Sequence, residues 1–116
     1  WFEIYVKDIE KAKSFYQAVF TTSLEKLDLP DIEMWSFPMT SEGYGSGGAL
    51  VKDDTMAQGT NSTVVYFNCN DCAIEASKVA DNGGLLIQEK TSIGQYGFIA
   101  LAKDPEGNLI GMHSQQ

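Results

Sequence analysis

The spacing of apolar and polar residues changes twice along the first half of the chain. Residues 2–6 are mostly aromatic or β-branched, which is typical of a strand. From position 9 the apolar residues recur every three or four positions, as on one face of a helix, and Asp8 precedes them as a candidate N-cap. This pattern predicts a helix over 8–20. Three strand-like segments follow, at about 24–29, 33–39 and 48–52, with turns at 30–31 and 41–45.

The second half repeats this order. A strand is predicted over 63–68 and a helix over 71–83, because Asp71 is again a candidate N-cap and Asn82-Gly83-Gly84 is a typical helix end. Strands follow at about 85–89, 97–102 and 109–113. Asp104-Pro105-Glu106-Gly107 has the residues of a type I turn, with Asp first, Pro second and Gly fourth.

The two halves superimpose at one offset, because Asp71 follows Asp8, and Gly111 follows Gly48, by the same 63 positions. We therefore predict an α+β fold of two βαβββ modules related by a pseudo-twofold axis. The modules should form a cupped mixed sheet with the helices outside and a concave face that suits a ligand. We expect one domain over 1–116, with module 1 at about 1–52, a linker at about 53–60 and module 2 at about 61–116.

Charge narrows the possible partners. The 116 residues include 8 Lys and Arg against 16 Asp and Glu, for a net charge of −8. Nucleic acids and anionic membranes both need a basic surface, so neither is an expected partner. The two cysteines, Cys69 and Cys72, form a C-x-x-C motif without a second pair for zinc. We interpret Cys69 as a small core residue rather than a redox group, and we expect a reducing cytoplasm.

Several segments resemble one known superfamily when they are taken together. They are residues 2–16, with the sequence FEIYVKDIEKAKSFY, and residues 18–20, 48–51, 93–101 and 104–113, which include the turn Asp-Pro-Glu-Gly-Asn. In this order they resemble the glyoxalase / bleomycin-resistance / dioxygenase superfamily, also called the vicinal oxygen chelate superfamily. The chain most resembles its uncharacterised bacterial glyoxalase-like proteins. The resemblance covers nearly the whole chain and implies the two-module fold.

The resemblance also implies where a divalent metal would bind. Enzymes of the superfamily hold it with His, Glu or Gln from the first and last strand of each half. Here those four places are Trp1, Gly48, Val64 and Gly111, whose side chains offer a metal no suitable lone pair. We therefore predict no metal and no cofactor. An atypical Mn²⁺, Fe²⁺ or Ni²⁺ site made by Glu3, His113 and a further carboxylate is the alternative.

Polar side chains are predicted on the concave face by strand alternation, because residues two apart share a face. This places Glu3 and His113, the only histidine, toward the same cavity, where they could divide acid and base roles. The competing interpretation is that both lie near frayed chain ends without a role. The predicted ligand contacts are Tyr5, Trp35, Tyr66, Asn68 and Tyr96, with core packing as the alternative for Trp35 and Tyr96.

Three functions follow as hypotheses. The first is a protein that binds a small organic molecule, like the bleomycin-resistance branch, or a metal-independent enzyme of unknown specificity acting on such a molecule. The second is a metal-dependent lyase, isomerase or dioxygenase with atypical ligands. The third is a subunit that acts mainly by association, since such domains often pair as homodimers. A thermal-shift screen with metabolites would separate binders from interaction subunits.

Overall fold

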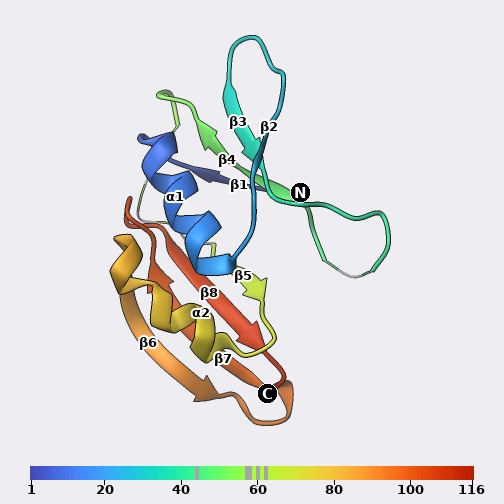
Figure 1. Cartoon of the computed structure of the whole chain (residues 1–116), viewed down its shortest axis with the longest axis vertical. Coiled ribbons are helices and arrows are strands. Elements are labelled where there is room, and N and C mark those ends of the chain that lie inside the picture. Colours follow the sequence, from blue (N-terminus) through green and yellow to red (C-terminus); the bar gives the residue numbers. More distant parts are fainter. Residues whose placement is uncertain (44, 57–58, 60, 62) are drawn as a thin grey trace.

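The fold consists of two consecutive modules with the same order of elements (Figure 1). The computed structural model describes residues 1–43, 45–56, 59, 61 and 63–116. The elements of the first module are β1 (Phe2–Tyr5), α1 (Ile9–Phe20), β2 (Glu25–Lys26), β3 (Glu33–Ser36) and β4 (Gly48–Lys52). Those of the second are β5 (Val65–Asn68), α2 (Cys72–Lys78), the 3₁₀ turn η1 (Ala80–Asn82), β6 (Leu85–Ser92), the 3₁₀ turn η2 (Gly94–Tyr96), β7 (Phe98–Lys103) and β8 (Leu109–Ser114).

Each module forms its own four-stranded mixed sheet. The strand orders are β1-β4-β3-β2 and β5-β8-β7-β6, so β1 and β5 are edge strands. The β1–β4 and β5–β8 pairs are parallel and the others antiparallel. Both helices lie on the same side of the sheets (Figure 1). The predicted α+β fold of two βαβββ modules is confirmed.

The helices begin and end where local sequence signals place them. The Asp8 carboxylate accepts a hydrogen bond from the Lys11 N–H (3.0 Å), and the Asp71 carboxylate accepts one from the Ala73 N–H (3.0 Å). The second α-helix is shorter than predicted, because it tightens into η1 after Lys78. Gly83, at φ 87°, then ends that turn in the left-handed region that favours glycine.

An aromatic cluster joins the helix-facing sides of the two modules. The rings of Phe20 from α1 and Phe67 from β5 stack with centroids 4.3 Å apart. Phe2 from β1 lies 6.1 Å from Phe67 and 5.7 Å from Phe37. Because these contacts cross between modules, the two sheets share one continuous core.

A buried carboxylate holds the modules together at the turn between β7 and β8. Asp104 is only 3% exposed. Its Oδ2 accepts hydrogen bonds from the Tyr16 hydroxyl of α1 (2.8 Å) and from Asn108 Nδ2 (2.8 Å). Its Oδ1 accepts bonds from the backbone N–H groups of Glu106 and Asn108, each 2.9 Å. The predicted turn therefore also links the second module to α1 of the first.

The structure corrects the expected repeat at the last strand of each module. Gly48 pairs with Phe2 and faces the helices, whereas Gly111 pairs with Tyr66 and faces away from them. The offset of 63, which is correct for the two N-caps, therefore fails by one residue between β4 and β8, and it is Gly48 that lies on the face opposite to the expected one. The ends of β3 and β6 also differ from the predicted ones. β3 stops at Ser36, shortly before Pro38, which has no N–H to donate, and β6 extends to Ser92 by pairing with β7 through irregular register.

Two predicted connections lie partly outside the described residues. The turn at 41–45 includes residue 44, and the linker at 53–60 includes residues 57, 58 and 60. Among the helices that the structure describes, none is both long and apolar enough to cross a membrane.

Candidate functional site

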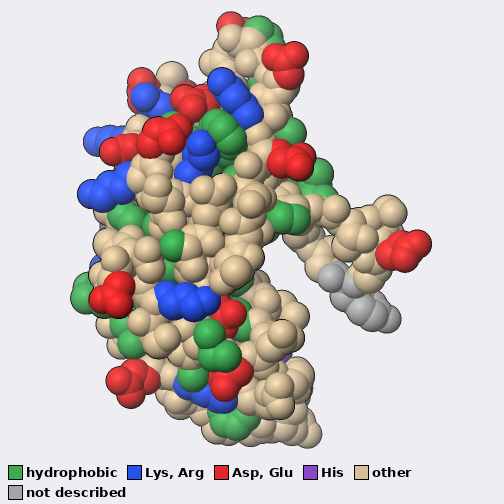
Figure 2. Space-filling view, in the orientation of Figure 1, with side chains coloured by type: hydrophobic (Ala, Val, Ile, Leu, Met, Phe, Trp, Pro, Cys, Tyr) green, Lys and Arg blue, Asp and Glu red, His purple; other side chains and the backbone are tan. Residues whose placement is uncertain are grey.

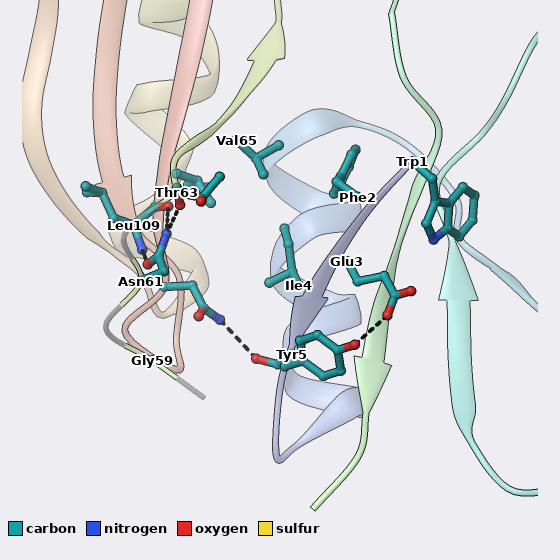
Figure 3. A pocket seen from close by; sticks show the side chains of 12 residues that line it. Trp1, Phe2, Glu3, Ile4, Tyr5, Gly59, Asn61, Thr63, Val65 and Leu109 are labelled. Atoms are coloured by element: carbon teal, nitrogen blue, oxygen red, sulfur yellow. Dashed lines mark hydrogen bonds between the residues drawn. The ribbon is translucent and has the colours of Figure 1, made fainter. Parts of the chain in front are cut away.

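A pocket of about 420 Å³ lies between β1 and the beginning of the second module. Figure 3 shows Trp1, Glu3 and Tyr5 on one side and Asn61, Thr63 and Leu109 on the other. Its described lining residues are Trp1, Phe2, Glu3, Ile4, Tyr5, Gly59, Asn61, Thr63, Val65, Asn108, Leu109 and Ile110. Its volume falls in the range of small-molecule sites.

A carboxylate and a phenol are paired on the β1 side of the pocket. The Tyr5 hydroxyl donates a hydrogen bond to Glu3 Oε2 at 2.6 Å. This bond, partial desolvation and the negative charges of Glu3 and Asp53 raise the pKa of Tyr5 to about 12. The phenol therefore remains protonated at neutral pH and keeps its hydrogen bond to Glu3.

Amide side chains fix the opposite wall. Asn61 Oδ1 accepts a hydrogen bond from the Leu109 N–H (2.9 Å), and its Nδ2 donates to the carbonyl oxygens of Leu109 (3.3 Å) and Thr63. Asn108 Nδ2 donates to the Tyr5 carbonyl oxygen at 3.3 Å and so crosses between the modules. The pocket thus has polar walls that are held in place before any ligand arrives.

The rest of the described pocket lining is apolar, and the one charged side chain in it is a carboxylate. Phe2, Ile4, Val65 and Ile110 come from the helix-facing sides of β1, β5 and β8, and Ile4 and Ile110 belong to the main core. Glu3 has the only charged side chain among the described lining residues. A neutral or cationic ligand suits this lining better than an anionic one.

A second group of predicted residues lies on the face of the second sheet opposite the helices, here called the open face. Asn68 is the register neighbour of His113, and Tyr66 is that of Gly111. His113 Nε2 lies 2.7 Å from the Tyr96 carbonyl oxygen. A carbonyl can only accept, so Nε2 carries the proton, and Nδ1 is the acceptor when the ring is neutral.

The structure does not bring all the predicted site residues together. Glu3 and Tyr5 line the pocket, whereas His113, Tyr66, Asn68 and Tyr96 are not among its lining residues. Trp35 lies elsewhere, because it packs against the helix-side core and the Lys13 Nζ atom of α1 sits 3.2 Å from its ring centroid. This placement corresponds to core packing, the alternative interpretation of Trp35, and Trp35 is not among the described residues that line the pocket.

The sequence interpretation missed the wall formed by Asn61, Thr63 and Asn108. Asn108 belongs to the Asp-Pro-Glu-Gly-Asn turn, and its hydrogen bond to the Tyr5 carbonyl oxygen holds it at the pocket. The role of Asn61 has no local sequence signal, because its pairing with Leu109 joins residues far apart in the sequence.

The residues at the superfamily's metal positions do not fit a metal. Gly48 faces the helices, and the neighbours of β4 on the opposite face are Ala49 and Val51, which also carry no donor atoms. Nowhere in the described part of the chain do three or more His, Cys, Asp or Glu side chains gather as a metal site. We therefore derive no chemistry through a metal.

The two cysteines are free and buried. Desolvation, followed by the charge and hydrogen bond of Glu75, raises the pKa of Cys69 to about 12, so that this thiol is a poor nucleophile at neutral pH. Both cysteines belong to the main core, in agreement with the interpretation of Cys69 as a core residue.

Residues 1–112 match the Glyoxalase/Bleomycin resistance protein/Dioxygenase superfamily. The chain belongs to this superfamily. The resemblance inferred from its sequence segments is thereby confirmed. No curated protein sequence matches the chain.

Solved structures share the superfamily fold at low sequence identity. Hypothetical protein SA1046 from S. aureus is 20% identical with a TM-score of 0.77, covering 98% of this chain and 91% of that one. TnmS3, an antibiotic binding protein from Streptomyces sp. CB03234, is 23% identical with a TM-score of 0.69, covering 98% and 92%. A glyoxalase I mutant from Zea mays is 20% identical with a TM-score of 0.75, covering 97% of this chain and 45% of that one. At these identities the likeness concerns the fold.

Proposed function

We propose that this superfamily member binds a small organic molecule in the pocket between β1 and the second module. The observation that carries the proposal is the Glu3–Tyr5 pair, which stands beside an apolar lining in a pocket with fixed walls. Small-molecule sites commonly combine an apolar lining with a few convergent polar groups. The shared fold with an antibiotic binding protein supports the same function.

A thermal-shift screen with a panel of metabolites tests the proposal. A ligand at 100 times its Kd should add about 2.7 kcal/mol to the free energy of unfolding. Glu3→Gln should weaken binding while the free protein still unfolds in one cooperative thermal transition. Glu25→Gln, an exposed carboxylate on β2 outside this pocket, is the matched control. A panel without any stabilising compound would contradict the proposal.

A metal-independent enzyme is the second candidate, because the hydrogen bond of His113 to Tyr96 leaves Nδ1 as a possible proton acceptor on the open face. In such an enzyme the substrate would lie on the open face and contact Tyr66 and Asn68. If a bound compound is converted, His113→Ala should abolish turnover and leave the melting temperature nearly unchanged. An unchanged rate in His113→Ala would remove this candidate.

We further propose that the chain acts as a cytoplasmic homodimer. Exposed apolar side chains support self-association: Tyr66 on the open face is 47% exposed and Tyr96 nearby is 66% exposed. On the helix-bearing side drawn in Figure 2, Lys side chains instead alternate with Asp and Glu. Light scattering should give twice the monomer mass, and a monomer at high concentration would contradict the dimer.

A further inference from the structure

The backbone of β1 presents unused hydrogen-bonding groups to the pocket. The Phe2 N–H donates to the Gly47 carbonyl (3.0 Å) and the Val6 N–H donates to the Val51 carbonyl (2.9 Å), both toward β4. Backbone groups of successive strand residues point to opposite sides, so those of Glu3 and Tyr5 point away from β4. The bond from Asn108 Nδ2 to the Tyr5 carbonyl shows the same orientation independently.

These groups are open in the part of the chain that the structure describes. The Tyr5 carbonyl is bonded by Asn108, but the N–H and C=O of Glu3 and the N–H of Tyr5 have no hydrogen-bond partner there. Glu3 and Tyr5 also line the pocket. An unpaired strand edge is a template for a further strand, because it repeats donors and acceptors at the spacing of an extended amide chain.

We propose that the pocket binds a short peptide-like amide, which adds in extended form to the free edge of β1. The inference rests on the proposed function and names the chemical class of its ligand. The edge consists of four residues, Phe2–Tyr5, so it pairs with only about two or three residues of an extended chain. The pocket volume of about 420 Å³ likewise fits a free small molecule rather than a protein segment.

The side chains around this edge define the ligand further. Phe2 and Ile4 offer an apolar surface to one side of the added strand, and Glu3 stands on the other. A protonated amine on the ligand would face the Glu3 carboxylate, whereas an acidic group would be repelled. The expected ligand is therefore an extended amide with one apolar and one basic substituent.

Isothermal titration calorimetry with acetyl-Val-Lys-Val-amide tests the inference. The wild-type protein should bind this peptide, and an analogue with two N-methylated amides should bind about tenfold more weakly, because it loses two donors. On the protein side, Glu3→Pro removes the open N–H without breaking the pairing with β4, since that N–H points away from β4. Glu3→Gln keeps the N–H and is the matched control, with a smaller loss than Glu3→Pro.

Amide hydrogen exchange keeps the inference testable if Glu3→Pro does not fold. The peptide should slow exchange at Glu3 and Tyr5 of the wild-type protein, while Ile4, which points to β4, stays unchanged. Equal binding of the peptide and its methylated analogue, or no binding of either, would overturn the inference. The proposed function would survive that result if the metabolite screen still yields a ligand, and would fall only if the screen yields none.

Discussion

Single residues in this protein take their properties from one or two close partners. Tyr5 owes its raised pKa chiefly to the hydrogen bond that it donates to Glu3. Cys69 owes its raised pKa chiefly to burial. At neutral pH the Tyr5 hydroxyl therefore stays protonated and donates its hydrogen bond, and the Cys69 thiol stays protonated and is a poor nucleophile. Neither property can be predicted from the sequence, because each depends on contacts made in the folded protein.

The Tyr5–Glu3 pair makes a prediction at this scale. Glu3→Gln replaces the carboxylate by a neutral amide, so the pKa of Tyr5 should fall from about 12 toward 10.0. Because the folded state holds the phenolic proton more tightly, the pair stabilises the fold below pH 10 and loses this effect as the pH rises toward 12. NMR titration of the Tyr5 ring carbon measures the shift directly. A pKa of Tyr5 that is equal in both proteins would contradict the pairing.

Elements are joined across the modules by few but specific contacts. The Tyr16 hydroxyl of α1 reaches Asp104 in the turn between β7 and β8, and burial together with the charge of Asp104 raises its pKa well above 10.0. The backbone N–H of Asp8 donates to Glu106 Oε1 of the same turn at 2.7 Å. These contacts position the second module beside β1, where the pocket lies.

Loss of the Tyr16 hydroxyl should weaken this junction. Tyr16→Phe removes one donor from a buried carboxylate and should lower the free energy of unfolding by about 1–3 kcal/mol. The exposed Tyr66 provides the control, because Tyr66→Phe should change stability by less than about 0.5 kcal/mol. Urea unfolding of both variants gives the comparison, and equal stabilities would show that the junction does not depend on this bond.

The last strands of the two modules allow a second matched test. A Cβ at Gly48 would meet the Phe2 ring, and a Cβ at Gly111 would meet the Tyr66 ring. Phe2 is held between Phe37 and Phe67, whereas Tyr66 is 47% exposed and can move aside. Gly48→Ala should therefore cost about 1–3 kcal/mol and Gly111→Ala clearly less, as measured by thermal unfolding. A larger cost at Gly111 would contradict the assigned faces.

For the whole molecule, the sequence predicts the fold better than the site. The N-caps Asp8 and Asp71 and the order of elements follow from local patterns, so the two-module architecture could be predicted. The alternation of side chains along one strand does not determine which residues of two separate strands are paired. A shift of one residue therefore placed Gly48 on the concave face, whereas it faces the helices. The pocket depends on contacts such as Asn108 to Tyr5, which no local pattern contains.

We place the proposed ligand between β1 and the second module, and chemical-shift mapping would locate it there or elsewhere. A compound that stabilises the protein in the thermal-shift screen is titrated into ¹⁵N-labelled protein. We expect the largest amide shifts at Glu3 and Tyr5 and at the side chains of Asn61 and Asn108, which line the pocket. Shifts centred instead on His113 and Tyr96, with β1 unaffected, would contradict this placement.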